Sequence, residues 1–238
     1  MIEDIKNINV DEIDKFETLI DEWWDPNGKL RTLHHINPIR LDYIDKAVKL
    51  EGKKVLDIGC GGGILTEAMA EKNAMVSGLD ASAAIIDAAI QHQKYTEKNI
   101  NYHSATAEQF SQDNNQSFDV ITCMELLEHI PDVQSLLQAC AKMLRPDGHL
   151  ILSTINRTMK SYLSAILAAE YLFQLLPKGT HNYSKFIKPS ELSHWLRQSG
   201  FTVFDLAGMN YVPGINYCAI TDNPSVNYLI HARLNIGK

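Results

Sequence analysis

The sequence predicts an α/β protein whose open, mostly parallel sheet is covered by helices on both faces. From residue 54 onward, short apolar segments typical of buried strands alternate with segments that have helical periodicity. The first of these strands, over 54–58, leads directly into a glycine-rich run over 59–63. Strands that alternate with helices predict right-handed βαβ units and therefore a parallel sheet.

Length and composition fit one sizeable domain, with 238 residues of which 45% are hydrophobic and 21% charged. The net charge of -7 argues against a nucleic-acid partner, because phosphate binding depends on clustered Lys and Arg. The four cysteines form no CxxC pair, which predicts reduced thiols. The acidic N-terminus lacks the apolar core of a signal peptide, and no run of about 20 apolar residues could span a membrane. We therefore expect a cytoplasmic protein.

The first 50 residues predict a helical extension that precedes a single domain over 51–238. An amphipathic helix is expected over 11–24, and the turn sequence at 25–28 ends it. Its apolar face consists of Ile13, Phe16, Leu19, Ile20 and Trp23. We expect the second helix to begin near Pro38, because proline suits the first turn of a helix.

Within the domain, predicted strands and helices follow one another along the chain. The strand segments are KVLDIG, MVSGLD, INYHSA, FDVITCM, HLILSTI, FTVFDL and a late strand around NYCAITD. The helical segments include TEAMAEKNA, SAAIIDAAIQHQKY and SELSHWLRQSG. A long segment, about 156–188, interrupts the alternation and predicts a helical insertion. A sheet that ends in a hairpin-like pair of strands is the simplest arrangement.

The run VLDIGCGGG places Gly59 and Gly61 between the first strand and the helix that follows. Glycines there let the backbone approach a ligand, whose polar groups meet N–H donors at the helix start. The spacing is GxGxG, since Ile64 stands where the dinucleotide pattern GxGxxG has its third glycine. A glycine pattern alone is weak evidence for any one cofactor.

Two aspartates at strand ends give this glycine loop a chemical context. Asp80 ends the second strand, 21 residues beyond Gly59, where a carboxylate can accept both hydroxyls of a ribose. The alternative is that Asp80 only caps the helix that starts at Ser82. Asp57 precedes the loop, and a carboxylate at that place often only braces backbone amides.

The order and spacing of VLDIGCGGG, GLD, FDVITCMELLEHI and LRPDGHLILSTIN resemble those of class I methyltransferases that depend on S-adenosylmethionine. The resemblance implies a three-layer, Rossmann-like fold with a mostly parallel, seven-stranded sheet. It implies that Gly59 and Gly61 face the methionine part of the cofactor. It also implies that Asp80 holds the ribose and that Met124 lies beside the adenosyl group.

Three further segments, WWDPNGKLRTLHHINPIR, CMELLEHI and PKGTHNYSKFIKP, extend the match to nearly the whole chain. Together they resemble the bacterial ubiquinone-biosynthesis O-methyltransferase family, whose members methylate hydroxyl groups on polyprenylated phenol and catechol rings. The resemblance implies both O-methylation steps, of the 3-demethylubiquinol 3-O-methyltransferase and 2-polyprenyl-6-hydroxyphenol methylase type. It also implies a lipid substrate and a place in a ubiquinone-biosynthesis complex.

The tryptophan-containing segment would supply the cofactor contacts of the extension. By resemblance, Arg40 approaches S-adenosylmethionine and makes a charge-assisted contact to its carboxylate. Trp23 and Trp24 are expected to anchor the extension, so that it forms a lid over the cofactor site. His34 and His35 are expected to face the substrate side, where a purely structural role explains them equally well.

Methyl transfer to oxygen needs an activated acceptor, because a phenol with a pKa of about 10 is mostly protonated at neutral pH. A general base or a metal ion could supply that activation. If a helix starts near Met124, then Glu125, Glu128 and His129 fall on one helical face. Histidine is well suited to act as a base near neutral pH, so His129 is the predicted catalytic residue.

The same three side chains have two other interpretations. By resemblance to eukaryotic relatives, they could hold a divalent cation such as Mg²⁺, although we assign no metal ligand. Alternatively, the acidic residues only favour a helix N-terminus through the helix dipole, and His129 only caps local polar groups.

The insertion contains SYLSAILAAEYLFQLL, an apolar segment too short to span a bilayer. Its flanks carry the basic residues Arg157, Lys160, Lys178, Lys185 and Lys188. An apolar helix with basic flanks can lie in an anionic membrane surface, where a polyprenyl tail would reside. We therefore expect peripheral association with the inner face of the cytoplasmic membrane through residues 156–188. A lid, a core helix and a dimer contact are the alternatives.

Rival functions predict motifs that differ from those present. An NAD-dependent oxidoreductase predicts GxGxxG, and a methyltransferase for exocyclic amines of nucleic acids predicts an Asn- or Asp-Pro-Pro-aromatic motif where this chain has CMEL. A non-enzymatic subunit of a biosynthetic complex is compatible with the fold, but the glycine loop, Asp80 and the acid/base cluster argue against it. A methyltransferase for another small phenolic or carbon acceptor is the main alternative.

Overall fold

The computed structural model describes residues 7–96, 98–163, 183–212 and 216–235. The strands are β1 (Lys54–Ile58), β2 (Met75–Asp80), β3 (Asn101–Ser104), β4 (Phe118–Met124), β5 (Leu144–Ile155), β6 (Phe201–Val212), β7 (Tyr217–Thr221) and β8 (Asn227–Leu234). The helices are α1 (Val10–Glu17), α2 (Arg31–Val48), α3 (Ile64–Ala70), α4 (Ala83–Thr96), α5 (Ala107–Phe110), α6 (Val133–Met143), α7 (Met159–Ser161) and α8 (Pro189–Gln198). Short 3₁₀ turns are present at η1 (Ile20–Glu22) and η3 (Tyr183–Lys185).

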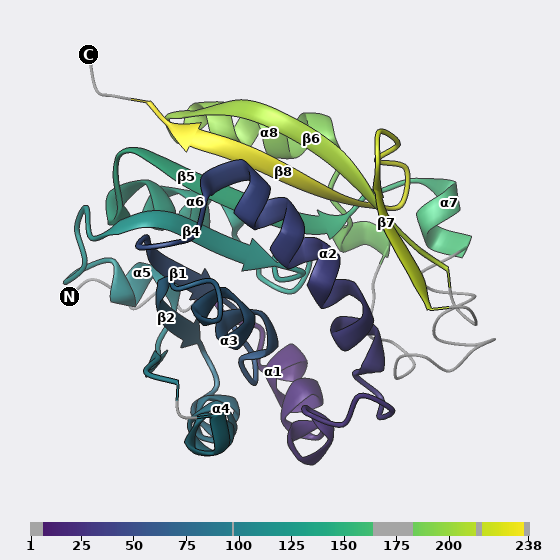
Figure 1. Cartoon of the computed structure of the whole chain (residues 1–238). Helices are drawn as coiled ribbons and strands as arrows, with labels where there is room; N and C mark the ends of the chain where they lie inside the picture. Colours follow the sequence, from purple (N-terminus) through teal and green to yellow (C-terminus); the bar gives the residue numbers. More distant parts are fainter. Residues whose placement is uncertain (1–6, 97, 164–182, 213–215, 236–238) are drawn as a thin grey trace.

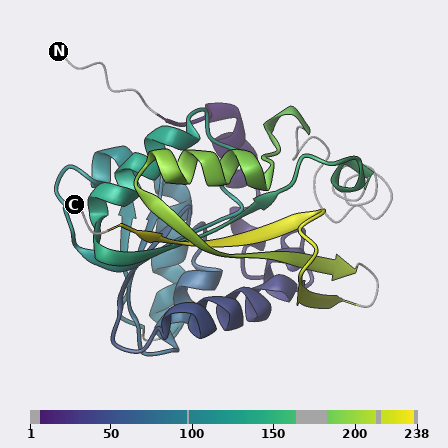
Figure 2. The same cartoon turned by 90° about the horizontal axis from the view of Figure 1, so that it is seen from above.

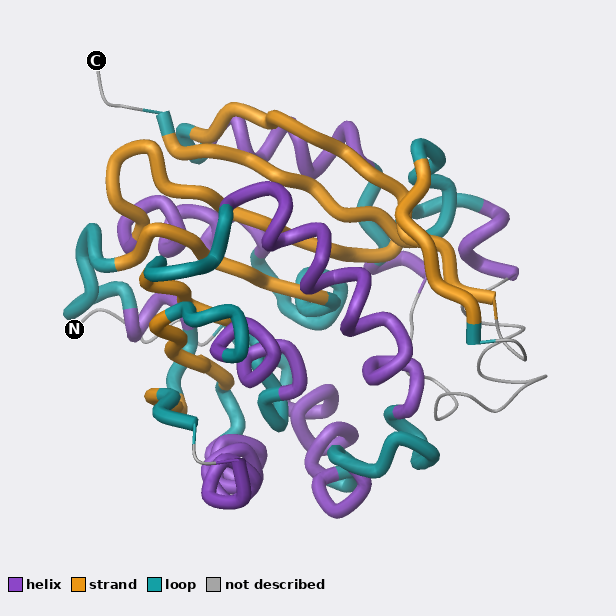
Figure 3. Tube along the Cα trace, viewed as in Figure 1, coloured by secondary structure: helices purple, strands orange, loops and turns teal. Residues whose placement is uncertain are grey.

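The strands form one eight-stranded sheet in the order β3-β2-β1-β4-β5-β8-β6-β7 (Figure 1). Seen from above, α8 lies on one side of this sheet and α2 on the other (Figure 2). The colouring by secondary structure shows the same layering, with helices flanking a continuous set of strands (Figure 3). The predicted three-layer α/β fold is confirmed.

The parallel half of the sheet is centred on β1, which pairs in parallel with both β2 and β4. The chain runs outward from β1 through β2 to β3 and then returns to β4 on the opposite side of β1. In open α/β sheets, such a reversal of strand order opens a crevice beyond the carboxyl ends of the strands, where ligands bind. The fold therefore places the site beyond the ends of β1 and β4.

The antiparallel half differs from the expectation in one strand. The predicted hairpin is present as β6 and β7, but the chain continues into β8, which lies between β5 and β6. The sheet therefore has eight strands where seven were expected. Residues 228–232 of β8 are buried, as in a central strand, but His231 and Arg233 interrupt the apolar pattern of its sequence.

The extension also departs from its predicted boundaries. The expected helix over 11–24 is divided into α1 and the short turn η1. Helix α2 begins at Arg31, so the prediction of a start near Pro38 is wrong and the proline lies inside the helix. The earlier start has a packing reason, since Leu33 and Ile36 lie in the same core cluster as residues further along α2.

A small core cluster joins the extension to the domain. Leu19, Trp23 and Leu30 of the extension pack with Ile64 of α3 and Ile85 of α4. Each of these side chains is buried, so their removal from water favours a docked extension. The extension is thereby held beside the helix that follows the glycine loop.

The predicted apolar segment of the insertion, 161–176, lies outside the described residues from position 164 onward. In the part of the chain that the structure describes, no helix is both long and apolar enough to cross a bilayer.

Candidate active site

A cavity of about 460 Å³ opens beyond the carboxyl ends of β1, β2 and β4, at the reversal of strand order. The six predicted site residues all line it, namely Arg40, Gly59, Gly61, Asp80, Met124 and His129. They come from the second helix of the extension, from two strand ends with the glycine loop, and from the end of β4 with its following turn. The structure thus brings the predicted residues to one place, while their individual roles stay predictions.

The glycine loop passes directly beneath a tryptophan ring of the extension. Gly59 and Gly61 adopt φ values of 68° and 54°, in the left-handed region that favours glycine. A Cβ atom on Gly61 would lie 2.2 Å from Trp23 Cζ2, and one on Gly62 would lie 2.3 Å from Trp23 Cδ1. These positions accept only glycine while the ring stays in place, so Trp23 anchors the extension on the loop as expected.

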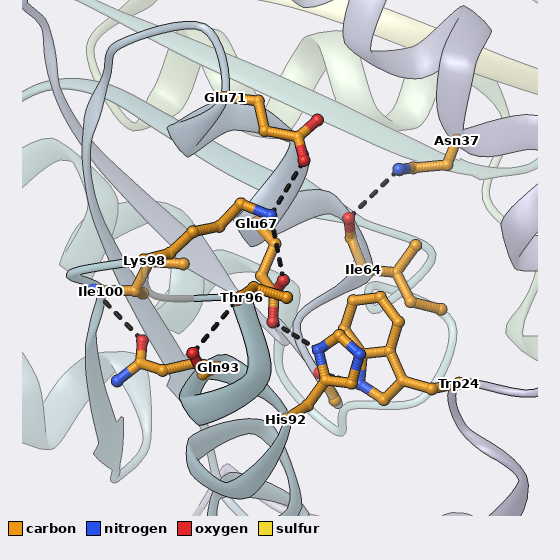
Figure 4. Close-up of polar contacts among 11 residues, drawn as sticks. Trp24, Asn37, Ile64, Glu67, Glu71, His92, Gln93, Thr96, Lys98 and Ile100 are labelled. Carbon is orange, nitrogen blue, oxygen red and sulfur yellow. Dashed lines mark hydrogen bonds and ion pairs between the residues drawn. The ribbon is translucent and has the colours of Figure 1, made fainter.

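The neighbouring Trp24 ties the same loop to two helices (Figure 4). Its indole Nε1 donates to the Gly62 carbonyl at 3.0 Å, and its ring stacks on His92 with centroids 3.4 Å apart. His92 Nδ1 lies 2.7 Å from a carboxylate oxygen of Glu67, and Lys98 Nζ lies 3.3 Å from the other. The loop, α3 and α4 are therefore joined to the extension by polar contacts as well as by packing.

Asp80 accepts from two backbone N–H groups outside the helix, while Ser82 Oγ accepts from the Ile85 N–H and caps α4. Its Oδ1 accepts from the Ser82 N–H at 3.0 Å, and its Oδ2 accepts from the Gly61 N–H at 3.1 Å. Burial raises the pKa of Asp80, while these N–H groups oppose the rise. A carboxylate oxygen can accept a second hydrogen bond, so these contacts are compatible with ribose binding at this residue.

Asp57 is a structural brace beneath the site. Its two oxygens accept from Thr66 Oγ1 and Thr122 Oγ1, each at 2.7 Å. Burial raises the pKa of Asp57 to about 6, although both hydroxyl donors and the charge of Arg40 oppose the rise. These bonds fix β1 against α3 and β4, because Thr66 and Thr122 belong to those elements.

The segment after β4 is a turn, so the prediction of a helix near Met124 is wrong. Glu125 adopts φ of 49° and its N–H lies within hydrogen-bonding distance of the Ser153 carbonyl and hydroxyl. A residue in the left-handed region cannot belong to a right-handed α-helix, so no helix includes Glu125. Consequently Glu125, Glu128 and His129 do not share a helical face.

The three side chains of this turn share no partner with one another. Glu125 accepts from Arg40 and Ser153, and the buried Glu128 accepts from Thr154 Oγ1 at 2.7 Å. The His129 ring contacts a carboxylate of α1. Among the described residues no group of three or more His, Cys, Asp and Glu side chains is placed to hold a metal ion. The residues as they stand do not fit the proposed cation, and we derive no step through it.

Arg40 is a buried cation at the edge of the cavity. Its Nη1 donates to Glu125 Oε2 at 2.5 Å and its Nη2 to Asn37 Oδ1 at 3.1 Å. Its Nε is buried with no hydrogen-bond partner among the described residues. A buried donor without a partner is costly, and here the guanidinium as a whole also lines the cavity. Arg40 is thus a cation at the cavity wall that could meet an anionic group of a ligand.

The sequence-based reasoning missed one residue that contacts the predicted base. Glu12 of α1 places Oε2 3.0 Å from His129 Nδ1, although 117 residues separate the two. The other histidines have structural contacts, since His34 Nε2 lies 2.9 Å from the Trp23 carbonyl oxygen and His35 Nδ1 lies 3.1 Å from the Tyr211 hydroxyl. Of the three, only His129 lines the cavity.

Comparison with known proteins places these features in a family. A family model described as a methyltransferase domain matches residues 31–206. The ubiquinone biosynthesis O-methyltransferase of Coxiella burnetii strain RSA 493 is 49% identical over 224 residues, covering 94% of this chain and 95% of the relative. The protein of the same name from Aromatoleum aromaticum is 48% identical over 229 residues, covering 95% and 98%. That from Pseudomonas fluorescens strain SBW25 is 47% identical over 226 residues, covering 95% and 97%.

Solved structures show the same fold at much lower sequence identity. The magnesium protoporphyrin IX methyltransferase of Synechocystis PCC 6803, solved with bound SAH, has a TM-score of 0.67 and 20% identity. The match covers 93% of this chain and 97% of that one. A methyltransferase from Thermotoga maritima also has a TM-score of 0.67, at 16% identity, and covers 92% and 98%. At these identities the likeness extends to the fold alone.

Proposed function

Because the chain belongs to the ubiquinone biosynthesis O-methyltransferase family, we propose that it transfers the methyl group of S-adenosylmethionine to ring hydroxyls of polyprenylated phenols and catechols. The proposal includes both O-methylation steps of ubiquinone biosynthesis. The observation that carries it is the single cavity in which Arg40, the glycine loop, Asp80 and His129 meet. Fixed positions of this kind suit a displacement reaction, since orientation can lower a barrier by up to roughly 7–11 kcal/mol.

The residues around the cavity fit S-adenosylmethionine. The guanidinium of Arg40, which lines the cavity, suits the carboxylate of its amino-acid part. The remaining lone pairs of Asp80 suit ribose hydroxyls, and the buried Met124 offers an apolar surface to the adenosyl group. When bound, S-adenosylmethionine supplies an electrophilic methyl group whose carbon–sulfur bond breaks with both electrons remaining on sulfur.

His129 would prepare the acceptor for this displacement. The proton of the ring hydroxyl passes to the imidazole, and the oxygen keeps the electron pair that forms the new carbon–oxygen bond. Proton removal of this kind contributes about 10²- to 10⁴-fold to a rate. A dependence on a divalent cation such as Mg²⁺ stays a prediction, which titration with Mg²⁺ against a chelator tests.

We expect the chain to label polyprenylated acceptors when supplied with methyl-labelled S-adenosylmethionine. Purified polyprenyl catechol and demethylubiquinol are incubated separately, and the products are identified by mass spectrometry. Methyl ethers of both acceptors would support the two-step proposal, and one ether alone would restrict it to a single step. Label on a ring carbon, on an unrelated phenol only, or on RNA or protein would overturn it, and no transfer at all would favour a non-enzymatic subunit.

The proposal extends to the place where the substrate is met. A polyprenyl tail resides in a bilayer, so we include reversible association with the inner face of the cytoplasmic membrane through 156–188 and a place in a ubiquinone-biosynthesis complex. Met159 and Leu163 support it, because they are 68% and 52% exposed at the start of the insertion. Two of the basic residues give less support to an attraction to anionic lipid, because Arg157 pairs with Glu191 and Lys185 pairs with Glu12.

Replacing Met159 and Leu163 together with aspartate should reduce binding to vesicles rich in anionic lipid, because two apolar contacts are lost and two negative charges are added. Co-sedimentation at low and high salt measures the effect. The control is Tyr95→Asp, which changes an 86% exposed residue of α4. Equal vesicle binding by the double variant and the wild-type protein would show that Met159 and Leu163 do not contact the membrane.

A further inference from the structure

The first helix of the extension contributes directly to the surroundings of His129. Glu12 Oε2 lies 3.0 Å from His129 Nδ1, and the two side chains are only 13% and 10% exposed. One helical turn further on, the Phe16 ring meets the His129 ring edge to face at a centroid distance of 5.4 Å. Glu12 and Phe16, at positions i and i+4 of α1, therefore both contact the imidazole, one with a carboxylate and the other with an aromatic ring.

A carboxylate at Nδ1 decides which nitrogen of a neutral imidazole carries the proton. Because Glu12 accepts the Nδ1 proton, the lone pair is left on Nε2, the nitrogen that would take a proton from an acceptor hydroxyl. We propose that Glu12 is a positioning residue that fixes the tautomer and orientation of His129 and stabilises its protonated form during methyl transfer. The inference deepens the function proposed above and rests on it.

The charges around Glu12 leave it ionised and aimed at His129. Its other oxygen, Oε1, lies 3.3 Å from Lys15 Nζ in the same helix and 3.5 Å from Lys185 Nζ of η3. Burial alone would raise the pKa of Glu12, but the hydrogen bond and charge of His129, together with Lys15, hold it below the usual range. A carboxylate is therefore the form that faces the imidazole at neutral pH.

A merely structural tether is the competing explanation for this pair. The extension has other tethers, since Asn7 Nδ2 donates to Glu108 Oε1 at 2.8 Å and the Asn7 amide oxygen accepts from the Asp132 N–H at 2.8 Å. Trp23 and Trp24 hold it on the glycine loop. Loss of the Glu12 charge should therefore leave the extension docked, which makes a specific test feasible.

The kinetic test compares Glu12→Gln with Asp14→Asn, which removes the same charge from an exposed position of the same helix. We expect Glu12→Gln to lower kcat about tenfold or more, with the KM for S-adenosylmethionine unchanged, by analogy with other carboxylates that orient a histidine. Asp14→Asn should leave both kcat and this KM unchanged. Equal kcat in the two variants would overturn the proposal.

A second measurement needs no turnover. The ¹⁵N chemical shifts of the His129 ring, recorded without acceptor, should report protonation at Nδ1 in the wild-type protein and a mixture of tautomers in Glu12→Ala. An identical tautomer in both overturns the proposal, provided that circular dichroism shows a folded variant. If the tautomer changes as expected but no phenolic acceptor is methylated, the proposed function fails and the pairing of Glu12 with His129 stands.

Discussion

Replacing His129 with alanine should lower the turnover number at least about a hundredfold, because the acceptor hydroxyl loses the base that takes its proton. His129 is buried and lines the cavity, but the groups that fit the cofactor are Arg40, the glycine loop and Asp80. The affinity for S-adenosylmethionine should therefore stay unchanged. Steady-state kinetics with a polyprenyl catechol gives the turnover number, and isothermal titration calorimetry gives the affinity.

The dependence of turnover on pH distinguishes the loss of a base from general damage to the fold. Without His129, turnover should rise as the pH approaches the phenol pKa of about 10, because the acceptor then ionises without help. The gap between variant and wild type should narrow over the same range. His194→Ala, at an exposed position of α8, serves as the control and should behave as wild type. Unchanged turnover in His129→Ala, or a gap that is constant with pH, would reject this role.

Sequence reasoning succeeded where the information is local. In a parallel sheet, the carboxyl ends of the strands meet at one edge, so the sequence pattern assigns Gly59 and Asp80 to a common site. Met124 is assigned there by resemblance. The structure places all three on the cavity. The α/β class followed equally well from the alternation of strands and helices.

It failed where a contact between distant residues decides the local conformation. The turn after β4 exists because Ser153 of the neighbouring strand holds Glu125 in the left-handed region and Arg40 pairs with its carboxylate. No periodicity within MELLEHI indicates either partner. The pairing of Glu12 with His129 likewise crosses 117 residues, and nothing in the pattern of the first helix distinguishes Glu12 from its acidic neighbours.

Replacing Arg40 with alanine should weaken the binding of S-adenosylmethionine and also destabilise the fold. Arg40 and Glu125 are 5% and 19% exposed and are joined at 2.5 Å, and removal of one partner from a buried ion pair costs about 3–5 kcal/mol. Loss of one charge-assisted contact of about 1.5–3 kcal/mol corresponds to an affinity roughly ten- to a hundredfold lower. Urea unfolding measures the first effect and calorimetry the second.

The double variant Arg40→Ala with Glu125→Gln distinguishes the two effects. Removing the carboxylate abolishes the unpaired charge that the alanine leaves behind, so the free energy of unfolding should recover by at least about 1 kcal/mol. The affinity for S-adenosylmethionine should stay low, because the guanidinium is still missing. Glu125→Gln alone should retain most of the affinity, since it leaves the cation in place. A double variant that binds S-adenosylmethionine as tightly as the wild type would show that Arg40 only neutralises Glu125 and has no part in the cofactor site.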